Sequence, residues 1–419
     1  MNPEILSQNK YFKWIILSLL VGVFAGITSS IFLHLLKIAT ETRIQNIYLI
    51  WFLPIAGLII GLLYHLYGRE ASRGNNLILE EIHNPKNIVP LRMAPMILFG
   101  TIVTHLFGGS AGREGTAVQM SASIADNIGK FFKVDSNERK ILLMAGAGAG
   151  FGSAIGAPIA GMIFGMEVIY IGKLKLSSWP QCFIASFTGY YTSLFLKIPH
   201  SHYPRIEIPH FSLNILLSIV IAGIVFGLVA LAFSRLTHFI EHISKHFIKI
   251  PYLIPLLSGI IIMVLYYFEG SYRYAGLGIS TIQEALEKMS SLKEPVLKTF
   301  FTSLTVGTGF KGGEFVPLVF IGTTLGSALA LFLPASFSFL GALGFASVFA
   351  GASNTPLACA LMASEIFGFK LFPYALLACY ISYYSSGHTG IYRTQKLHRK
   401  KHHRIHTIFP SLINIFNNK

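Results

Sequence analysis

Long uncharged stretches set the strongest limit on how this chain folds. Residues 14–36, 211–233 and 252–268 contain no Lys, Arg, Asp or Glu, and each is close to the ~20 residues that a helix needs to cross a bilayer. Only 12% of the 419 residues are charged, about half the usual share of a soluble domain. The sequence therefore predicts an all-α polytopic membrane protein. The first stretch is too long for the core of a signal peptide, which predicts a retained helix.

The excess of basic residues lies mainly in loops and in the tail. The formal net charge is +15, and KLHRKKHHR lies in the basic segment 393–404. Such clusters beside membrane helices mark the cytoplasmic side and favour anionic lipid. Lys10 and Lys13 flank the first helix in the same way. We therefore expect a multi-pass protein of the cell (inner or plasma) membrane with both termini cytoplasmic. Nothing else in the sequence supports nucleic-acid binding.

Residues that often carry metal or redox chemistry are scattered. Cys182, Cys359 and Cys379 lie in separate apolar stretches, which argues against a disulfide framework or a zinc knuckle. The sequence contains no HExxH, P-loop lysine or GxSxG motif. We expect no metal, no cofactor and no enzymatic activity. Four histidines fit a solvated basic tail better than a metal site: His398, His402, His403 and His406.

The chain contains two related halves. In GAPIAGMIFGME, Glu167 follows Pro158 by nine positions, and in NTPLACALMASE, Glu365 follows Pro356 by the same spacing. Upstream, Gly-Arg-Glu at 112–114 matches Gly-Gly-Glu about 200 residues later. These landmarks occur in the same order in both halves, which is the signature of an internal repeat.

Several apolar segments are too short or too interrupted by Gly and Pro to be simple spans, namely 94–109, 143–158 and 315–333. In transporters such segments often mark helices that stop at mid-membrane, and matching ones in two halves point to a substrate site between the halves. The expected organisation is a cytoplasmic N-terminus (1–13), a first half (14–200), a linker (201–210), a second half (211–392) and a basic cytoplasmic tail (393–419).

Glycine turns in front of Glu114 and Glu314 predict helix N-termini. An N-terminus offers unpaired amides and about half a positive charge, and glycine lets those amides approach an anion closely. The turn at 74–76 offers a third N-terminus, and Tyr392 at the end of GHTGIY can donate a hydrogen bond. Several N-termini aimed at one point make an anion site without a Lys or Arg in the pore.

A carboxylate on such a turn competes with the anion for the same amides. A charge near the bilayer centre costs at least ~2.5–3.5 kcal/mol, so Glu114 must face protein or water. Ionised, its side chain would occupy the site, and protonated it would leave, which couples proton movement to anion movement. The equally weighted alternative is that Glu114 pairs with a buried Arg or caps a helix.

Taken together, these motifs resemble the CLC chloride channel and transporter family. GREGT at 112–116 resembles the GREGP signature, GGEFVP at 312–317 resembles GGxFxP, and GAPIAGMIFGME and Tyr392 follow in the expected order. The resemblance covers nearly the whole transmembrane chain. It implies a homodimer with a separate pore in each subunit, two inverted halves with broken, re-entrant helices, and a role for Glu114 as the external gate.

The departures from the family pattern resemble the fluoride-exporting branch, CLC-F. GNNLI at 74–78 replaces GSGIP and puts Asn75 at the position of the anion-coordinating serine. Glu314 stands where most members have an apolar residue, and Val168 stands where chloride/proton exchangers keep an internal proton-transfer glutamate. The resemblance therefore implies export of fluoride by fluoride/proton antiport.

Fluoride is small and strongly hydrated, so it needs close donors to replace lost water. The Asn75 amide, the Tyr392 hydroxyl and the backbone amides after Glu314 can donate. Phe315 and Val316 follow Glu314, where some branch members have a Val-Thr pair. Without the threonine hydroxyl, only the backbone amides there can coordinate the anion. The expected gate and proton-transfer residues are Glu114 and Glu314. The expected anion-binding residues are Gly74, Asn75, Gly112, Phe315, Val316 and Tyr392.

Other conspicuous residues have simpler expected roles. Glu167 and Glu365 are expected to share a structural role by binding nearby backbone. We expect packing roles or buried anchoring for Arg113, His105, Phe310 and Phe320.

Two other functions remain open. One is a chloride/proton exchanger or passive anion channel of the same family. The other is a membrane-embedded enzyme with Glu114 or Glu314 as general base, although no His, Ser or metal-ligand set accompanies them in the sequence.

Overall fold

The computed structural model describes residues 3–198 and 200–401, and these are mostly helical. The predicted all-α membrane fold is confirmed. The expectation for the tail beyond Lys401, including His402, His403 and His406, concerns residues outside the described part of the chain.

Each half of the chain supplies eight of the sixteen described α-helices, and four short 3-10 helices lie between them. The first half contains α1 (Pro3–Gln45), α2 (Leu53–Tyr67), α3 (Asn75–His83), α4 (Met93–Leu106), α5 (Glu114–Phe131), α6 (Ser136–Ile155), α7 (Pro158–Glu167) and α8 (Trp179–Phe195). The second half contains α9 (Leu213–Phe247), α10 (Leu253–Glu269), α11 (Ile279–Glu287), α12 (Lys293–Gly307), α13 (Phe315–Leu329), α14 (Phe337–Ser353), α15 (Pro356–Phe367) and α16 (Phe372–Ser385). The 3-10 helices are η1 (Ile47–Phe52), η2 (Ala71–Arg73), η3 (Leu176–Ser178) and η4 (Phe369–Leu371).

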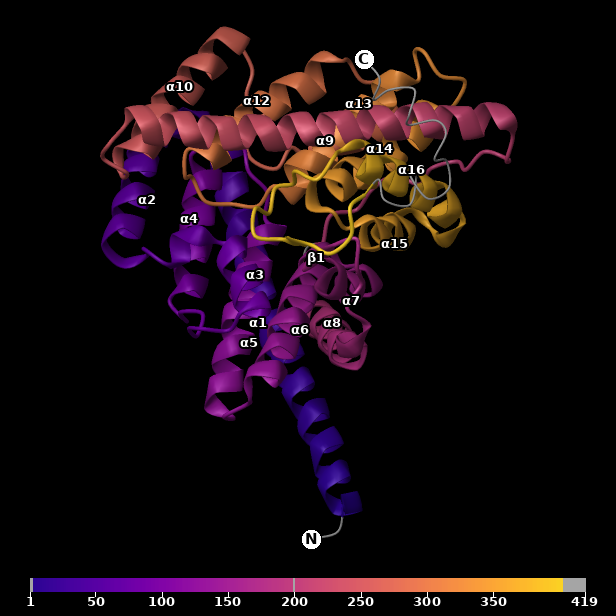
Figure 1. The fold of residues 1–419 in the computed structure, drawn as a ribbon. Coiled ribbons are helices and arrows are strands. Elements are labelled where there is room, and N and C mark those ends of the chain that lie inside the picture. The colour runs from indigo at the N-terminus through magenta and orange to yellow at the C-terminus, as the bar shows by residue number, and fades with distance from the viewer. Residues whose placement is uncertain (1–2, 199, 402–419) are drawn as a thin grey trace, which may run out of the picture.

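The two halves of the chain occupy different parts of the molecule. In Figure 1 most of α1–α8 lies in the lower part, whereas most of α9–α16 lies above, with the long helix α9 running horizontally below α10 and α12. Two short strands tie the end of the described chain to the first half: β1 (Tyr170–Ile171) pairs in parallel with β2 (Lys396–Leu397).

Three described helical segments are long and apolar enough to cross a membrane: Tyr11–Gln45, Ile47–Tyr67 and Leu213–Phe247. The first and third confirm the stretches at 14–36 and 211–233. The predicted stretch at 252–268 forms α10, whose 17 residues fall short of the ~20 of a full span. The segment at 47–67 is not among the predicted stretches, because Pro54 interrupts it. Pro54 lies in the first turn of α2, where proline is tolerated.

As predicted, none of the three interrupted segments is among the described helices that are long and apolar enough to cross a membrane, although the glycines inside 143–155 do not interrupt the helix there. Residues 94–109 and 315–333 form the short helices α4 and α13. The stretch at 143–158 instead belongs largely to α6, a continuous helix of 20 residues. Its glycines serve packing: a Cβ at Gly146 would lie 2.6 Å from Ala125 Cβ, and one at Gly148 would lie 2.6 Å from Gly161 O. Small residues thus let neighbouring helices approach closely.

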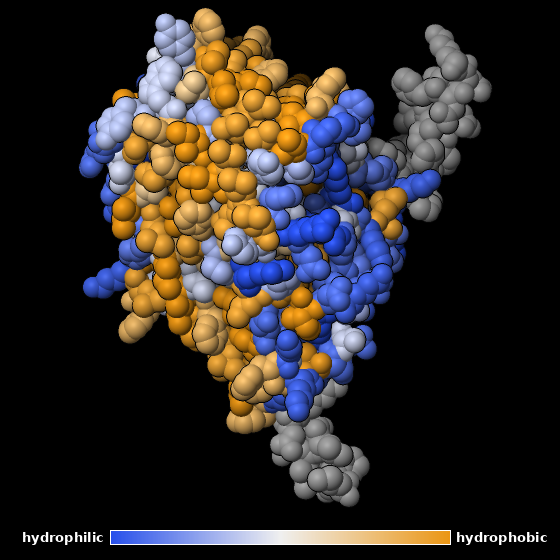
Figure 2. All heavy atoms as spheres, turned by 90° about the vertical axis from the view of Figure 1, so that its left-hand side faces the viewer, coloured by the Kyte–Doolittle hydropathy of each residue, from blue (hydrophilic) through white to orange (hydrophobic). Residues whose placement is uncertain are grey.

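A broad apolar surface covers one side of the molecule (Figure 2). Large hydrophobic side chains are exposed on α2 (Ile55, Ile59) and α10 (Leu257, Ile261). A contiguous surface of this kind on a protein with spanning helices is suited to contact with lipid.

Close contact between α13 and α14 fixes the N-terminus of α13. A Cβ at Gly322 would overlap the carbonyl oxygen of Gly344, and a Cβ at Gly344 would overlap that of Gly322. Both positions therefore require glycine, and Phe315, at the start of α13, is buried.

Candidate functional site

Two glycine turns from opposite halves of the chain are hydrogen-bonded to each other. Gly112 N donates to Gly313 O at 2.5 Å, and Gly313 N donates to Gly112 O at 2.8 Å. A Cβ at Gly313 would lie 2.7 Å from Gly115 N, so glycine is needed for this approach. The N-termini of α5 and α13 therefore meet at one place.

The N-terminus of α3 reaches the same place. Gly74 has a φ of +57°, a left-handed conformation that favours glycine. Asn75 Nδ2 lies 3.4 Å from the position of a Cβ on Gly115. Gln119, in the second turn of α5, approaches Gly74, where its Nε2 would lie 3.3 Å from a Cβ. Within the described residues, Asn75 Oδ1 and Gln119 Oε1 are buried without a hydrogen-bond partner. Both amide side chains can rotate to present donors.

These three helices begin without side-chain caps. The N-cap positions of α3, α5 and α13 are Gly74, Arg113 and Glu314, and none caps its own helix. By contrast, α6 begins with a capping box at Asp135 and α9 with a capping serine, Ser212. Uncapped N-termini carry free amides and partial positive charge, which is the chemistry of an anion site.

The Glu114 side chain lies at the mouth of α5 and is buried. Its Oε1 accepts a hydrogen bond from Arg113 Nε at 3.0 Å, and its Oε2 accepts one from Arg113 N at 3.3 Å. Arg113 Nη2 donates to Ser201 Oγ at 3.1 Å. The pairing of Glu114 with a buried arginine is therefore present. It occurs at the helix N-terminus itself, and Arg113 anchors this turn to the segment before α9.

The Glu314 carboxylate has a different environment. Within the described residues it accepts no hydrogen bond and forms no ion pair, and it interacts electrostatically with the Tyr392 phenol. Ile391 N donates to Ala352 O at 2.9 Å, and Gly390 O accepts from the His238 ring at 3.0 Å. These contacts hold the loop that carries Tyr392.

Aromatic rings that were not predicted as site residues surround Phe315. Phe315 meets Phe151 and Phe349 edge to face, at centroid distances of 5.4 and 4.8 Å, while Phe151 stacks on Phe164 at 4.0 Å. Ring edges carry partial positive charge, so this cluster suits a neighbouring anion. Phe151 and Phe349 each lie seven residues before the repeat proline, Pro158 or Pro356. That spacing could have identified them.

The remaining sequence predictions have clear outcomes. Glu167 and Glu365 bind backbone amides, as expected. The ring of His105 is buried with Nε2 3.4 Å from Gly112 O, and its Nδ1 has no partner among the described residues. Phe310 and Phe320 are buried in the apolar core, as predicted.

No group of three or more His, Cys, Asp or Glu residues that could hold a metal ion occurs in the part of the chain that the structure describes. The three cysteines are free and buried.

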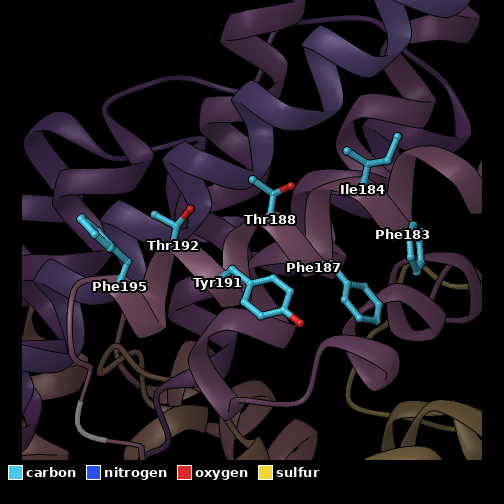
Figure 3. Close-up of a pocket in the computed structure, with 7 residues that line it drawn as sticks. All are labelled: Phe183, Ile184, Phe187, Thr188, Tyr191, Thr192 and Phe195. Carbon is cyan, nitrogen blue, oxygen red and sulfur yellow. The ribbon is translucent and has the colours of Figure 1, made fainter.

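A shallow groove of about 530 Å³ lies along α8 (Figure 3). Its walls are mainly aromatic, with Phe183, Tyr191 and Phe195 exposed. No uncapped helix end or carboxylate lines it, so it is not an ion site.

Comparison with known proteins identifies the family of the chain. The sequence profile described as "Voltage gated chloride channel" matches residues 56–387. The chain is 44% identical over 409 residues to the "Chloride/fluoride channel protein" of Pseudomonas syringae pv. tomato, covering 96% of this chain and 90% of that protein. It is 28% identical to the "H(+)/Cl(-) exchange transporter ClcA" of Vibrio cholerae, over 78% of this chain and 75% of that protein.

Two solved structures share the architecture. The crystal structure of a CLC-type fluoride/proton antiporter superposes with a TM-score of 0.89 at 32% identity, covering 92% of this chain and 98% of that chain. A slow cyanobacterial Cl⁻/H⁺ antiporter superposes with a TM-score of 0.78 at 20% identity, covering 90% and 96%, and shows the fold alone. Since the family profile spans most of the sequence and a relative is 44% identical over nearly all of it, this chain belongs to the CLC, or voltage-gated chloride channel, family.

Proposed function

We propose that this protein moves fluoride out of the cell in exchange for protons. The observation that carries the proposal is the convergence of three uncapped helix N-termini, those of α3, α5 and α13, on a site that also holds Glu114 and Glu314. The names of the fluoride/proton antiporter and of the chloride/fluoride channel relative support fluoride as the ion.

In this mechanism backbone amides replace the water that fluoride loses. The predicted donor role of the Gly112 amide is wrong, because Gly112 N already donates to Gly313 O. Amides at Phe315 and Val316, together with the N-terminus of α3, supply close donors without a full positive charge, so the ion is held and can still leave. The Asn75 side chain and the Tyr392 hydroxyl complete the donor set. Phe315 adds a ring edge on the same side.

Proton coupling rests on the two carboxylates. Ionised Glu114 is held against the N-terminus of α5 by Arg113. Protonation removes the charge that this pair stabilises, so the side chain leaves and an anion takes its place. Glu314, whose carboxylate has no partner in the described residues, exchanges protons with the other side of the membrane, because Val168 cannot relay them.

The same proposal includes the setting of the transporter. We place it in the cell membrane with both termini cytoplasmic, with the segments 14–200 and 211–392 as inverted halves around the site and 201–210 as the linker. It acts in transport and catalyses no chemical reaction. The aromatic groove on α8 supports a homodimer, since a second copy seated there would cover Phe183, Tyr191 and Phe195. Size measurement of the purified protein by light scattering, with Tyr191→Ser as the disrupting variant, tests this.

The test of function uses purified protein in liposomes loaded with fluoride or, separately, with chloride. An ion-selective electrode follows anion efflux while a pH electrode follows proton entry. Fluoride efflux with opposing proton uptake and little chloride flux is the expected result. Comparable chloride flux would indicate the chloride/proton exchange named for the Vibrio cholerae relative. Anion flux without proton movement would indicate a channel and would contradict coupling through Glu114.

A further inference from the structure

A second cavity, lined by none of the residues at the three converging N-termini, lies beside β2 and the end of α7. Its volume is about 1340 Å³, larger than the ~300–1,000 Å³ typical of small-molecule sites. One wall is formed by residues after β1 and at the ends of α7 and α16, and the other by the segment 398–401. The cavity is therefore roofed by the end of the described chain.

Specific hydrogen bonds hold this roof in place. Gln395 Nε2 donates to Val168 O at 2.7 Å and to Ser353 O at 2.8 Å, and His398 N donates to Ile171 O at 3.1 Å. Lys401 Nζ donates to Tyr383 O at 2.7 Å and is itself buried. The roof is thus part of the folded structure and gives the cavity a defined shape.

The charges that line the cavity do not balance. Four basic side chains line it, Lys173, Arg399, Lys400 and Lys401, against one carboxylate, Glu167. That carboxylate already accepts hydrogen bonds from two backbone amides of α15. In residues 3–198 and 200–401, no ion-pair partner is present for Lys173, Arg399 or Lys400. Cations gathered from both walls with no acidic partner favour a bound anion.

The other lining groups indicate what kind of anion fits. Tyrosines and histidines lie among the basic groups, including Tyr170, Tyr383 and His398. The Tyr170 and His398 rings meet edge to face at 6.1 Å. Arginine and lysine are the usual partners of phosphate oxygens, and flat rings suit the organic part of a ligand. The volume leaves room for an organic anion much larger than a halide.

We propose that this cavity binds a phosphate-bearing anion, with Arg399, Lys400 and Lys173 as its charged contacts. The chemistry is shared by two sources: the headgroup of an anionic phospholipid and a soluble phosphate such as a nucleotide. This cavity shares no lining residue with the three converging N-termini, and its proposed ligand is not the transported ion, so the proposal does not depend on which ion the protein transports.

The test measures the Tm of the purified full-length chain by intrinsic fluorescence during titration. The probes are dihexanoyl phosphatidylglycerol, ATP and inorganic phosphate, with dihexanoyl phosphatidylcholine as the zwitterionic control. We expect a saturable rise in Tm with an anionic probe and none with the control. Arg399→Gln/Lys400→Gln should raise the half-saturating concentration about tenfold or more. Lys130→Gln/Lys396→Gln removes the same amount of charge outside the cavity and should leave the half-saturating concentration unchanged.

Each outcome decides the proposal. Saturation by phosphatidylglycerol alone identifies a lipid headgroup, saturation by ATP or phosphate alone identifies a soluble ligand, and saturation by both identifies the phosphate as the recognised group. Lack of saturation by any anionic probe, or equal losses in the two double variants, would overturn the site. Lys173→Gln, on the opposite wall, gives an independent variant if the roof variant folds poorly, and it should weaken binding in the same direction.

Discussion

Glu167 and Glu365 each cap the N-terminus of a helix in the opposite half of the chain. Glu167, at the end of α7, accepts from Leu357 N at 3.1 Å and Ala358 N at 2.8 Å at the start of α15. Glu365, in α15, accepts from Ile159 N at 2.9 Å and Ala160 N at 2.8 Å at the start of α7. Two helix N-termini are thus closed by carboxylates from the other half of the chain. At α5 the carboxylate of Glu114, the first residue of the helix, accepts from the N-cap amide of Arg113, whereas the N-cap residues of α3 and α13 form no side-chain cap.

Replacing either capping carboxylate should therefore weaken the contact between the halves. Glu365→Gln removes charge-assisted hydrogen bonds and should cost roughly 1–3 kcal/mol of stability. Glu167→Gln should cost a similar amount, and thermal unfolding in detergent measures both. The exposed Glu207→Gln is the control and should change the Tm little. An unchanged Tm in both capping variants would show that these caps do not contribute.

Glu114→Gln should abolish proton coupling. The neutral side chain cannot release a proton and loses its ion pair with Arg113, so anion movement should continue without proton uptake. Parallel fluoride and pH recordings in liposomes measure this. Ser201→Ala removes only the second contact of Arg113 and should keep coupling. Proton uptake that persists in Glu114→Gln would exclude the gate assignment.

Glu314→Ala should cause a severe loss of fluoride transport, on the order of tenfold or more, equivalent to ~1.4 kcal/mol or more in the barrier. Its carboxylate is unpaired within the described residues, so the loss would not arise from breaking an ion pair there. Fluoride efflux from liposomes is the measurement. Glu284→Ala, which removes a half-buried carboxylate paired with Arg273, is the control. Wild-type turnover in Glu314→Ala would assign that residue a structural role.

Asn75→Ser should weaken the preference for fluoride over chloride. A hydroxyl offers one donor where the amide offers two, and the shorter side chain leaves more room for a larger ion. The ratio of fluoride to chloride efflux measures the change. Asn76→Ser alters the neighbouring residue, whose side chain accepts from Thr394, and should leave the ratio unchanged. An unaltered ratio in Asn75→Ser would remove Asn75 from the anion site.

Docking of the segment 393–401 should strengthen as pH rises from about 7 to about 10. Burial lowers the pKa of Lys401 to about 7, whereas an exposed lysine titrates near ~10.4. Between these two pH values the undocked segment binds more protons than the docked one. The equilibrium constant for docking should therefore rise by up to about tenfold per pH unit in this range and become independent of pH below about pH 7. Hydrogen-exchange protection of residues 393–401, measured across this pH range in the unchanged protein and in Lys401→Met, gives the pH dependence of docking in each. Equal slopes in both proteins would contradict it.

The sequence predicted the polar residues of the candidate site on the glycine turns better than the helix residues that pack around them. Glu114, Glu314 and Asn75 could be found because each stands on or beside a glycine turn. Gln119 could not, since it lies on a helical stretch with no signal of its own and approaches Gly74 only through folding. Phe151 and Phe349 were detectable only by extending the repeat upstream of its prolines. Glycines inside α6 misled the prediction, because helix packing and helix breaking use the same residue.

The hydrogen bonds between Gly112 and Gly313 limit how the transporter can move. They join the two halves beside the proposed ion site, so a rocking motion of one half against the other would have to break both bonds there. Alternating access by rigid rocking is therefore disfavoured in this chain. The backbone can stay fixed through the transport cycle while side chains on the two sides of the membrane open and close in turn. Access would then be controlled by two side-chain gates and not by movement of one half of the chain.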